Sequence, residues 1–170
     1  MTASGVVGAV VFGLLSAYFP PLNAEIYAVA APVIFPDLWV LHVSAMTGGL
    51  VVGKVTHFIA AEKGAEAFVK RREEKEARTA AKSRRPRGAV RERLARWSKS
   101  MIDVLDRPRL GPLVILASSG VGFPPLAVVT VAAGIKGISL TLFVVVTTIG
   151  CLARFLITSW LVVQGIQLDF

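Results

Sequence analysis

The placement of charge divides this chain of 170 residues into two apolar blocks around one basic middle segment. Of its 19 lysines and arginines, 17 lie between Lys54 and Arg109, and the first 53 residues carry only Glu25 and Asp37 as charged side chains. Hydrophobic residues make up 54% of the chain and its mean hydropathy is +0.65, more than the core of one soluble domain requires. The pattern predicts an integral membrane protein.

Two apolar segments, residues 38–61 and 138–166, are long enough to cross a membrane as helices, which takes about 20 residues. The basic residues between them predict that segment 62–109 is cytoplasmic, because Lys and Arg concentrate in cytoplasmic loops. The first five residues contain no Lys or Arg. A secretory signal would begin with a positive region, so we expect the N-terminal block to be retained.

The tetrapeptide Phe-Pro-Pro-Leu occurs at residues 19–22 and again at residues 123–126, each time inside a shorter apolar stretch. Two adjacent prolines remove two backbone donors and push the preceding residue out of the helical region. In lipid, such a break is tolerated only where protein or a water-filled cavity satisfies the freed carbonyls. We therefore expect re-entrant hairpins around residues 19–25 and 118–126. Their tips are Pro20, Pro21, Pro124 and Pro125. For the first copy, the alternative is one kinked crossing over residues 5–35.

The two apolar blocks also repeat each other beyond this tetrapeptide. Each continues through an Ala-rich stretch, a polar break, a long apolar segment, and a glycine followed by a cation, Gly49 with Lys54 and Gly150 with Arg154. We therefore predict an all-α polytopic membrane protein, an inverted repeat of re-entrant hairpin plus transmembrane helix. Its parts are a first membrane half at residues 1–61, a cytoplasmic basic helical segment at 62–109 and a second membrane half at 110–170.

Several short motifs resemble the DedA or VTT-domain (SNARE-associated) membrane protein superfamily, in particular its small YqaA-like members. Residues 18–25, Tyr-Phe-Pro-Pro-Leu-Asn-Ala-Glu, are similar to the Pro-Pro-x-Pro-Ser-Glu hairpin of that family, with Asn23 in place of its third proline. Residues 132–139, Phe143 and residues 150–155 are similar to its C-terminal pattern of an Ala-Gly turn, a Phe and a Gly. The Pro-Gly-x-Arg of the family's second hairpin is absent.

The resemblance implies a transporter or a lipid flippase or scramblase that moves a phospholipid or a polyprenyl phosphate in the plasma (inner) membrane. The alternative is a membrane anchor or scaffold, without transport, whose basic loop recruits a partner or anionic lipid. Broken helices favour transport, because an anchor does not require them. Neither an enzymatic activity, a metal site nor a cofactor is expected, since no nucleophile or metal-binding motif occurs.

The ionisable residues within the apolar blocks are the candidates for a transport site. A charged group at membrane depth is costly enough that a functional role is the default hypothesis. Glu25 directly follows the first proline break, and Asn23 lies beside it. Arg154 lies well inside the last long segment, where it can pair with Glu25, contact a lipid phosphate or extend to the membrane interface. His42 is a candidate proton relay or an interfacial polar group.

The basic segment contains an amphipathic stretch, in which apolar residues recur every three or four positions from Val90 to Leu105. Such a helix beside membrane spans typically lies among the lipid headgroups. The residues expected to bind the membrane surface are Arg91, Arg93, Arg96, Trp97 and Lys99. Nucleic-acid binding is the competing interpretation, but no specific nucleic acid is expected because positive-inside bias explains much of the charge. Membrane lipids are the expected partners, and the small size of the chain favours a homodimer.

Overall fold

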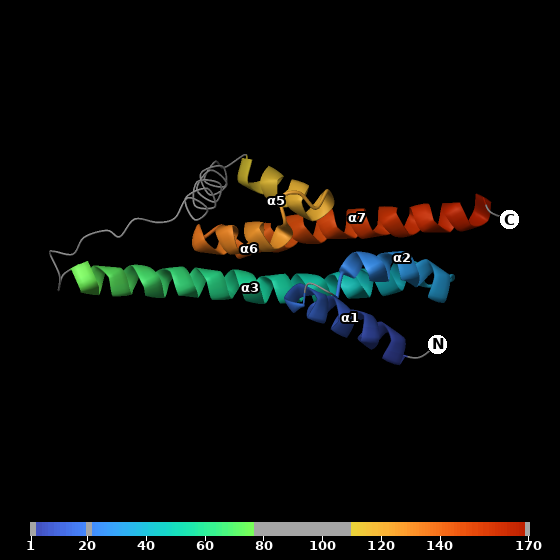
Figure 1. Cartoon of the computed structure of the whole chain (residues 1–170), viewed down its shortest axis with the longest axis horizontal. Helices are drawn as coiled ribbons and strands as arrows, with labels where there is room; N and C mark the ends of the chain where they lie inside the picture. Colours follow the sequence, from blue (N-terminus) through green and yellow to red (C-terminus); the bar gives the residue numbers. More distant parts are fainter. Residues whose placement is uncertain (1–2, 20–21, 77–109, 169–170) are drawn as a thin grey trace, which may run out of the picture.

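The computed structural model describes residues 3–19, 22–76 and 110–168, and all regular structure in this part of the chain is helical (Figure 1). The helices are α1 (Ala3–Tyr18), α2 (Ala24–Ile34), α3 (Trp39–Glu76), α5 (Leu110–Gly120), α6 (Leu126–Ile135) and α7 (Leu140–Leu168). The predicted all-α class is confirmed. The bounds of α6 coincide with the apolar stretch that follows the second proline pair.

Two of these helices are long and apolar enough to cross a membrane, as predicted. Residues 39–65 of α3 and 140–165 of α7 satisfy both criteria, with mean hydropathies of 1.3 and 2.2 for their apolar windows. At about 1.5 Å per residue, each extends roughly 40 Å, more than the ~30 Å of a bilayer's hydrocarbon core. The two helices contact each other and run antiparallel (Figure 1).

At each Phe-Pro-Pro-Leu one helix ends and the next one starts, and the chain reverses its direction (Figure 1). The pair α1 and α2 enters from the end of the molecule where α3 begins. The pair α5 and α6 enters from the opposite end, where α7 begins, so both turns lie at the level of the middle of the long helices (Figure 1). A single kinked helix over residues 5–35 is not what the structure contains.

The short helices divide their contacts between the two long ones. The first helix of each hairpin packs on the long helix of its own half, α1 on α3 and α5 on α7. The second packs mainly on the long helix of the other half, α2 on α7 and α6 on α3, and α2 also contacts α3. Small residues allow this close packing. A Cβ added at Gly49 would collide with the carbonyl of Val10, and one added at Gly150 would collide with the Ser119 side chain.

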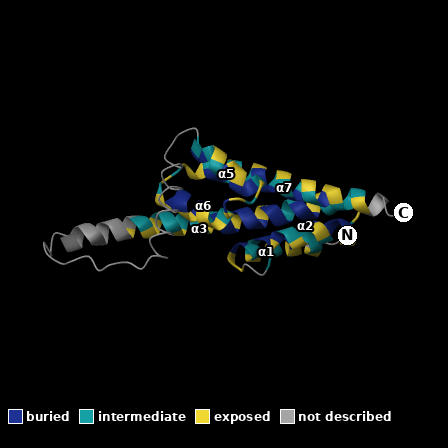
Figure 2. Cartoon of the chain, turned by 45° about the horizontal axis from the view of Figure 1, so that its top comes forward, coloured by how far each residue is buried: buried dark blue, intermediate teal, exposed yellow. Residues whose placement is uncertain are grey.

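The described helices bury large apolar side chains such as Phe58 and Phe143, but they also bury small polar ones and leave many large apolar ones exposed. Thr47, Thr130 and Ser159 are completely buried, whereas Val121 and Phe123 are 78% and 71% exposed. Exposed side chains lie along the outer faces of α1, α5 and α7 (Figure 2). Extended apolar surfaces of this kind mark contact with a membrane or another protein.

The predicted boundary between the first membrane half and the basic segment does not coincide with a break in secondary structure. Helix α3 continues through residues 61 and 62 and ends at Glu76. Only the composition changes there, because charged residues follow Ala61. The amphipathic stretch at 90–105 lies outside the described residues.

Candidate functional site

The first hairpin turn places a carboxylate at the start of α2. Asn23 is the N-cap of this helix, and its side-chain Oδ1 accepts a hydrogen bond from the backbone N–H of Glu25 at 3.0 Å. Asn is a favoured capping residue because it satisfies a backbone donor that the helix leaves unpaired. Glu25 therefore lies in the first helical turn, where the helix dipole stabilises a negative charge.

The second turn contains no charged side chain. The hydroxyl of Ser118 donates a hydrogen bond of 2.6 Å to the carbonyl of Pro124 and thereby closes the turn. Gly122 has a φ of +84°, which favours glycine, and a Cβ at this position would meet the guanidinium of Arg154 within 3 Å. The second turn thus leaves room for an arginine that comes from α7.

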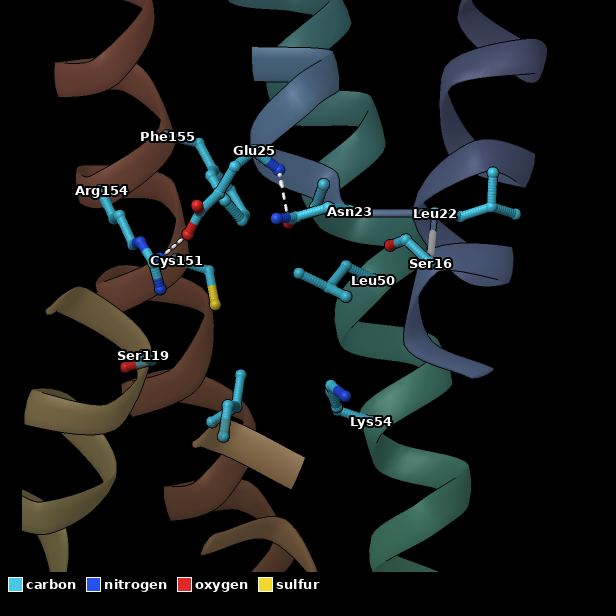
Figure 3. A pocket seen from close by; sticks show the side chains of 12 residues that line it. Ser16, Leu22, Asn23, Glu25, Leu50, Lys54, Ser119, Cys151, Arg154 and Phe155 are labelled. Carbon is cyan, nitrogen blue, oxygen red and sulfur yellow. Dashed lines mark hydrogen bonds and ion pairs between the residues drawn. The ribbon is translucent and has the colours of Figure 1, made fainter. Parts of the chain in front are cut away.

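Arg154 lies between the two hairpin turns. Its Nη2 forms an ion pair with Oε1 of Glu25 (Figure 3). The side chains of Arg154 and Glu25 remain 28% and 41% exposed. This ion pair joins residues 129 positions apart in the sequence and connects α7 to the first hairpin.

A cavity of about 160 Å³ lies beside this ion pair. Both turns and both long helices contribute to its lining: Ser16, Leu22, Asn23, Ala24, Glu25, Leu50, Lys54, Ser119, Leu126, Cys151, Arg154 and Phe155. Lys54 on α3 lies across the cavity from the Glu25–Arg154 pair (Figure 3). The cavity is therefore lined by two cations and one carboxylate.

The residues predicted for the transport site fall into two groups. Asn23, Glu25 and Arg154 all line the cavity, whereas His42 does not. His42 is buried near the start of α3, stacked on the ring of Phe35 with its Nδ1 3.1 Å from the hydroxyl of Tyr27. It is 12 residues before Lys54, roughly 18 Å along the helix, and this separation keeps it from the cavity.

The other predicted residues are only partly covered by the structure. Pro124 is buried in the second turn, and Pro125 is the exposed N-cap residue of α6. Pro20 and Pro21 lie outside the described residues. The same holds for the residues predicted to bind the membrane surface, Arg91, Arg93, Arg96, Trp97 and Lys99.

The sequence-based site omitted Lys54, the second cation of the cavity. The signal for it was present, because a cation follows the repeated glycine in both apolar blocks, Lys54 five residues after Gly49 and Arg154 four residues after Gly150. Ser16, Ser119 and Cys151 were also omitted. Nothing in their local sequence distinguishes them from other small residues of an apolar helix, so no signal could have identified them.

Comparisons of the chain with protein-family models, curated proteins and solved structures give no match. Over residues 3–19, 22–76 and 110–168, no cluster of three or more His, Cys, Asp or Glu side chains is placed to hold a metal ion. The charged cavity is the feature of this chain from which a function is inferred.

Proposed function

We propose that this protein is an integral membrane transporter of the DedA type, a flippase or scramblase that moves a phospholipid or polyprenyl-phosphate headgroup across the plasma membrane. The observation that carries this proposal is the cavity between two proline-broken hairpin turns, with Glu25, Arg154 and Lys54 in its lining. An apolar helical body has no structural need for three ionisable groups at one place, since buried charges are costly.

The arrangement of the helices supports an inverted repeat in the membrane. The halves have matching helix partners, and each long helix receives one short helix from the other half. Many transporters are built from such repeats, with the substrate site near the midplane among broken helices. In this arrangement, α3 and α7 cross the membrane, the hairpins enter from opposite faces, and the basic segment 62–109 is cytoplasmic.

The cavity provides a polar binding site for a headgroup on its path between the leaflets. The N-terminal ends of α2 and α6 both begin at the turns, and helix N-termini favour anions. Arg154 and Lys54 supply positive charge, while Glu25 compensates for part of that charge when no substrate is bound. The acyl or polyprenyl tails would remain in the lipid beside the exposed apolar faces of the helices.

Transport of labelled lipid in proteoliposomes tests this function directly. The full chain is reconstituted with phosphatidic acid that carries a fluorophore, and dithionite quenching from outside measures the exchange between leaflets. We expect exchange well above that of protein-free vesicles, and Glu25→Gln should reduce it to the protein-free rate. Asp37→Asn is the matched control, because Asp37 is an exposed acid away from the cavity lining. Vesicles with wild-type protein that show no exchange would favour the anchor or scaffold.

Cysteine labelling tests the proposed topology. In a Cys151→Ser background, single cysteines at Ser4 and Gly165 should react with an impermeant maleimide from the outside of intact cells, and one at Lys63 should not. All three positions are exposed and lie in described helices. Labelling of Ser4 and Gly165 from opposite sides would contradict the inverted arrangement.

A further inference from the structure

Lys54 is a buried cation that has no partner among the described residues. Its residue exposure is 7%, and in the part of the chain that the structure describes no ion pair or hydrogen bond of its side chain is found. A lone ammonium group in an apolar environment is strongly unfavourable unless a counter-charge or hydrogen-bond acceptor accompanies it. Lys54 lines the cavity, so a molecule bound there can provide both.

The internal repeat shows where the charge imbalance originates. Phe123 lies 104 positions after Phe19, and the residue 104 positions after Glu25 is Val129, a completely buried apolar side chain. Both long helices thus bring a cation to the cavity, whereas only the first hairpin brings an acid. Glu25 forms an ion pair with Arg154, and the positive charge of Lys54 remains uncompensated among the described residues.

The hydrogen-bonding groups around the cavity favour an acceptor-rich ligand. The hydroxyls of Ser16 and Ser119 donate to carbonyls of their own helices, at 2.7 Å to Gly13 and 2.9 Å to Ile115. The Oδ1 of Asn23 accepts from Glu25, which leaves its amide N–H₂ as a donor. With the side chains of Lys54 and Arg154, this amide makes nitrogen donors the predominant polar groups of the cavity. An oxyanion with several acceptor oxygens satisfies such donors.

The size of the cavity limits what can occupy it. Its volume of about 160 Å³ is close to that of an engineered protein cavity of ~150 Å³ that holds a benzene molecule. This volume admits a tetrahedral oxyanion, whereas most of a nucleotide or of a complete lipid would lie outside it. The ligand is therefore a single anionic group, either free in solution or at the end of a longer molecule.

We infer that Lys54 is the principal ligand-binding cation of this cavity and that it holds a phosphate-class oxyanion, while Arg154 remains paired with Glu25. This inference rests on the proposed function for the membrane setting of the site, but it concerns binding and not transport. The two cations thus have separate roles. Lys54 binds the ligand, and Arg154 holds the first hairpin turn against α7.

Ligand-induced stabilisation of the detergent-solubilised full chain tests this role. The thermal unfolding midpoint is measured against increasing inorganic phosphate, dioctanoyl phosphatidic acid and dioctanoyl glycerol. We expect the wild type to be stabilised by a phosphate-bearing ligand and not by the neutral glyceride. Stabilisation by inorganic phosphate identifies a soluble anion as sufficient, and stabilisation by phosphatidic acid alone identifies a lipid headgroup. Stabilisation by neither phosphate ligand would overturn the inference.

Variants at Lys54 then separate binding from folding. Lys54→Met should weaken the apparent affinity for the phosphate ligand by about tenfold or more, because it removes a charged partner from a buried site. It should leave the ligand-free midpoint unchanged or higher, since an unpaired buried charge disappears. Lys54→Arg should retain binding, and Lys63→Met should bind like the wild type because Lys63 is exposed on the same helix.

Two results would contradict the role of Lys54 as the ligand-binding cation, and each is distinct from failure of the proposed function. Equal affinity in wild type and Lys54→Met would show that another residue holds the ligand. A large fall of the ligand-free midpoint in Lys54→Met would show that Lys54 has a protein partner and a structural role. Loss of lipid exchange in proteoliposomes with intact phosphate binding would remove the transport proposal and leave the binding inference standing.

Discussion

The two halves of the molecule, residues 3–76 and 110–168, use the same order of helices but build their hairpin turns from different chemistry. The first turn carries a capping asparagine and a carboxylate, and it reaches the other half through the Glu25–Arg154 ion pair. The second turn carries no ionisable side chain and contributes Gly122, which leaves space for the same arginine. The first turn therefore contributes a charged side chain, and the second turn contributes the space that Arg154 occupies. Two sets of helices in the same order can hold an asymmetric site because their turns are free to differ in sequence.

The largest effect is expected where the first helix of a hairpin packs on its own long helix. Gly49→Ala should lower the free energy of unfolding by about 3 kcal/mol, since the added methyl group meets the backbone of Val10, which cannot move alone. Gly150→Ala should cost about half as much, because its first obstacle is the Ser119 side chain. SDS-induced unfolding in mixed micelles measures both values.

Gly48 provides the matched control for this comparison. A Cβ at Gly48 has no atom within 4 Å outside its own helix segment. Gly48→Ala should therefore cause no loss of stability, and alanine's greater helix propensity can even raise it by up to about 1 kcal/mol. Equal losses for Gly48→Ala and Gly49→Ala would mean that α1 does not pack closely on α3.

The second effect concerns the room that the second turn leaves for Arg154. Gly122→Ala should lower the free energy of unfolding by about 2 kcal/mol, because a side chain is strained at positive φ and the new methyl group also displaces the guanidinium. Gly137 has a φ of +63° with open space around it, so Gly137→Ala should cost only the backbone strain, about 1 kcal/mol. Identical values for the two variants would show that Arg154 does not lie against the second turn.

The third effect is the coupling between the halves through the ion pair. In a double-mutant cycle with Glu25→Gln and Arg154→Met, we expect a coupling energy of about 1.5 kcal/mol, moderated by the partial exposure of both side chains. Each single variant leaves one charge without its partner. The double variant should therefore be more stable than the sum of the two single losses of unfolding free energy predicts. Additive losses, measured by SDS unfolding, would contradict a direct pair.

The smallest effect is expected at the cap of α2. Asn23→Ala removes the side-chain acceptor of the Glu25 backbone N–H and should cost about 1 kcal/mol. Pro125, the N-cap residue of α6, makes no side-chain cap hydrogen bond, so Pro125→Ala should change stability less. A larger loss at Pro125 than at Asn23 would reverse the assignment of the polar cap to the first turn.

Much of the helical framework could be predicted from the sequence because its causes are local. Adjacent prolines interrupt a helix wherever they occur, and each Phe-Pro-Pro-Leu does separate two helices. The length of the apolar segments indicates the two long helices, α3 and α7. Continuity of α3 beyond Ala61 is equally local, since residues 62–76 are good helix formers despite their charge.

The site was predictable only in part, because its members come from segments far apart in the chain. Glu25 and Arg154 stood out as charges in apolar surroundings, but His42 had the same appearance and lies elsewhere, stacked on Phe35. Lys54 was visible as a cation in the repeat, although its burial and its lack of a partner among the described residues depend on how α3 packs.

The sequence by itself determined that this chain is helical, where its helices break, and which charges stand inside apolar segments, because backbone donors, side-chain hydropathy and proline geometry act over a few residues. Only the tertiary structure decided that α2 packs on α7 and α6 on α3, and that two hairpin turns meet at one cavity. The contacts of α2 with α7 join residues more than 100 positions apart, and those of α6 with α3 join residues at least 50 positions apart. No local periodicity encodes such pairing. The physical reason is that helix association depends on the shape of small-residue surfaces and on the partner available to each buried charge.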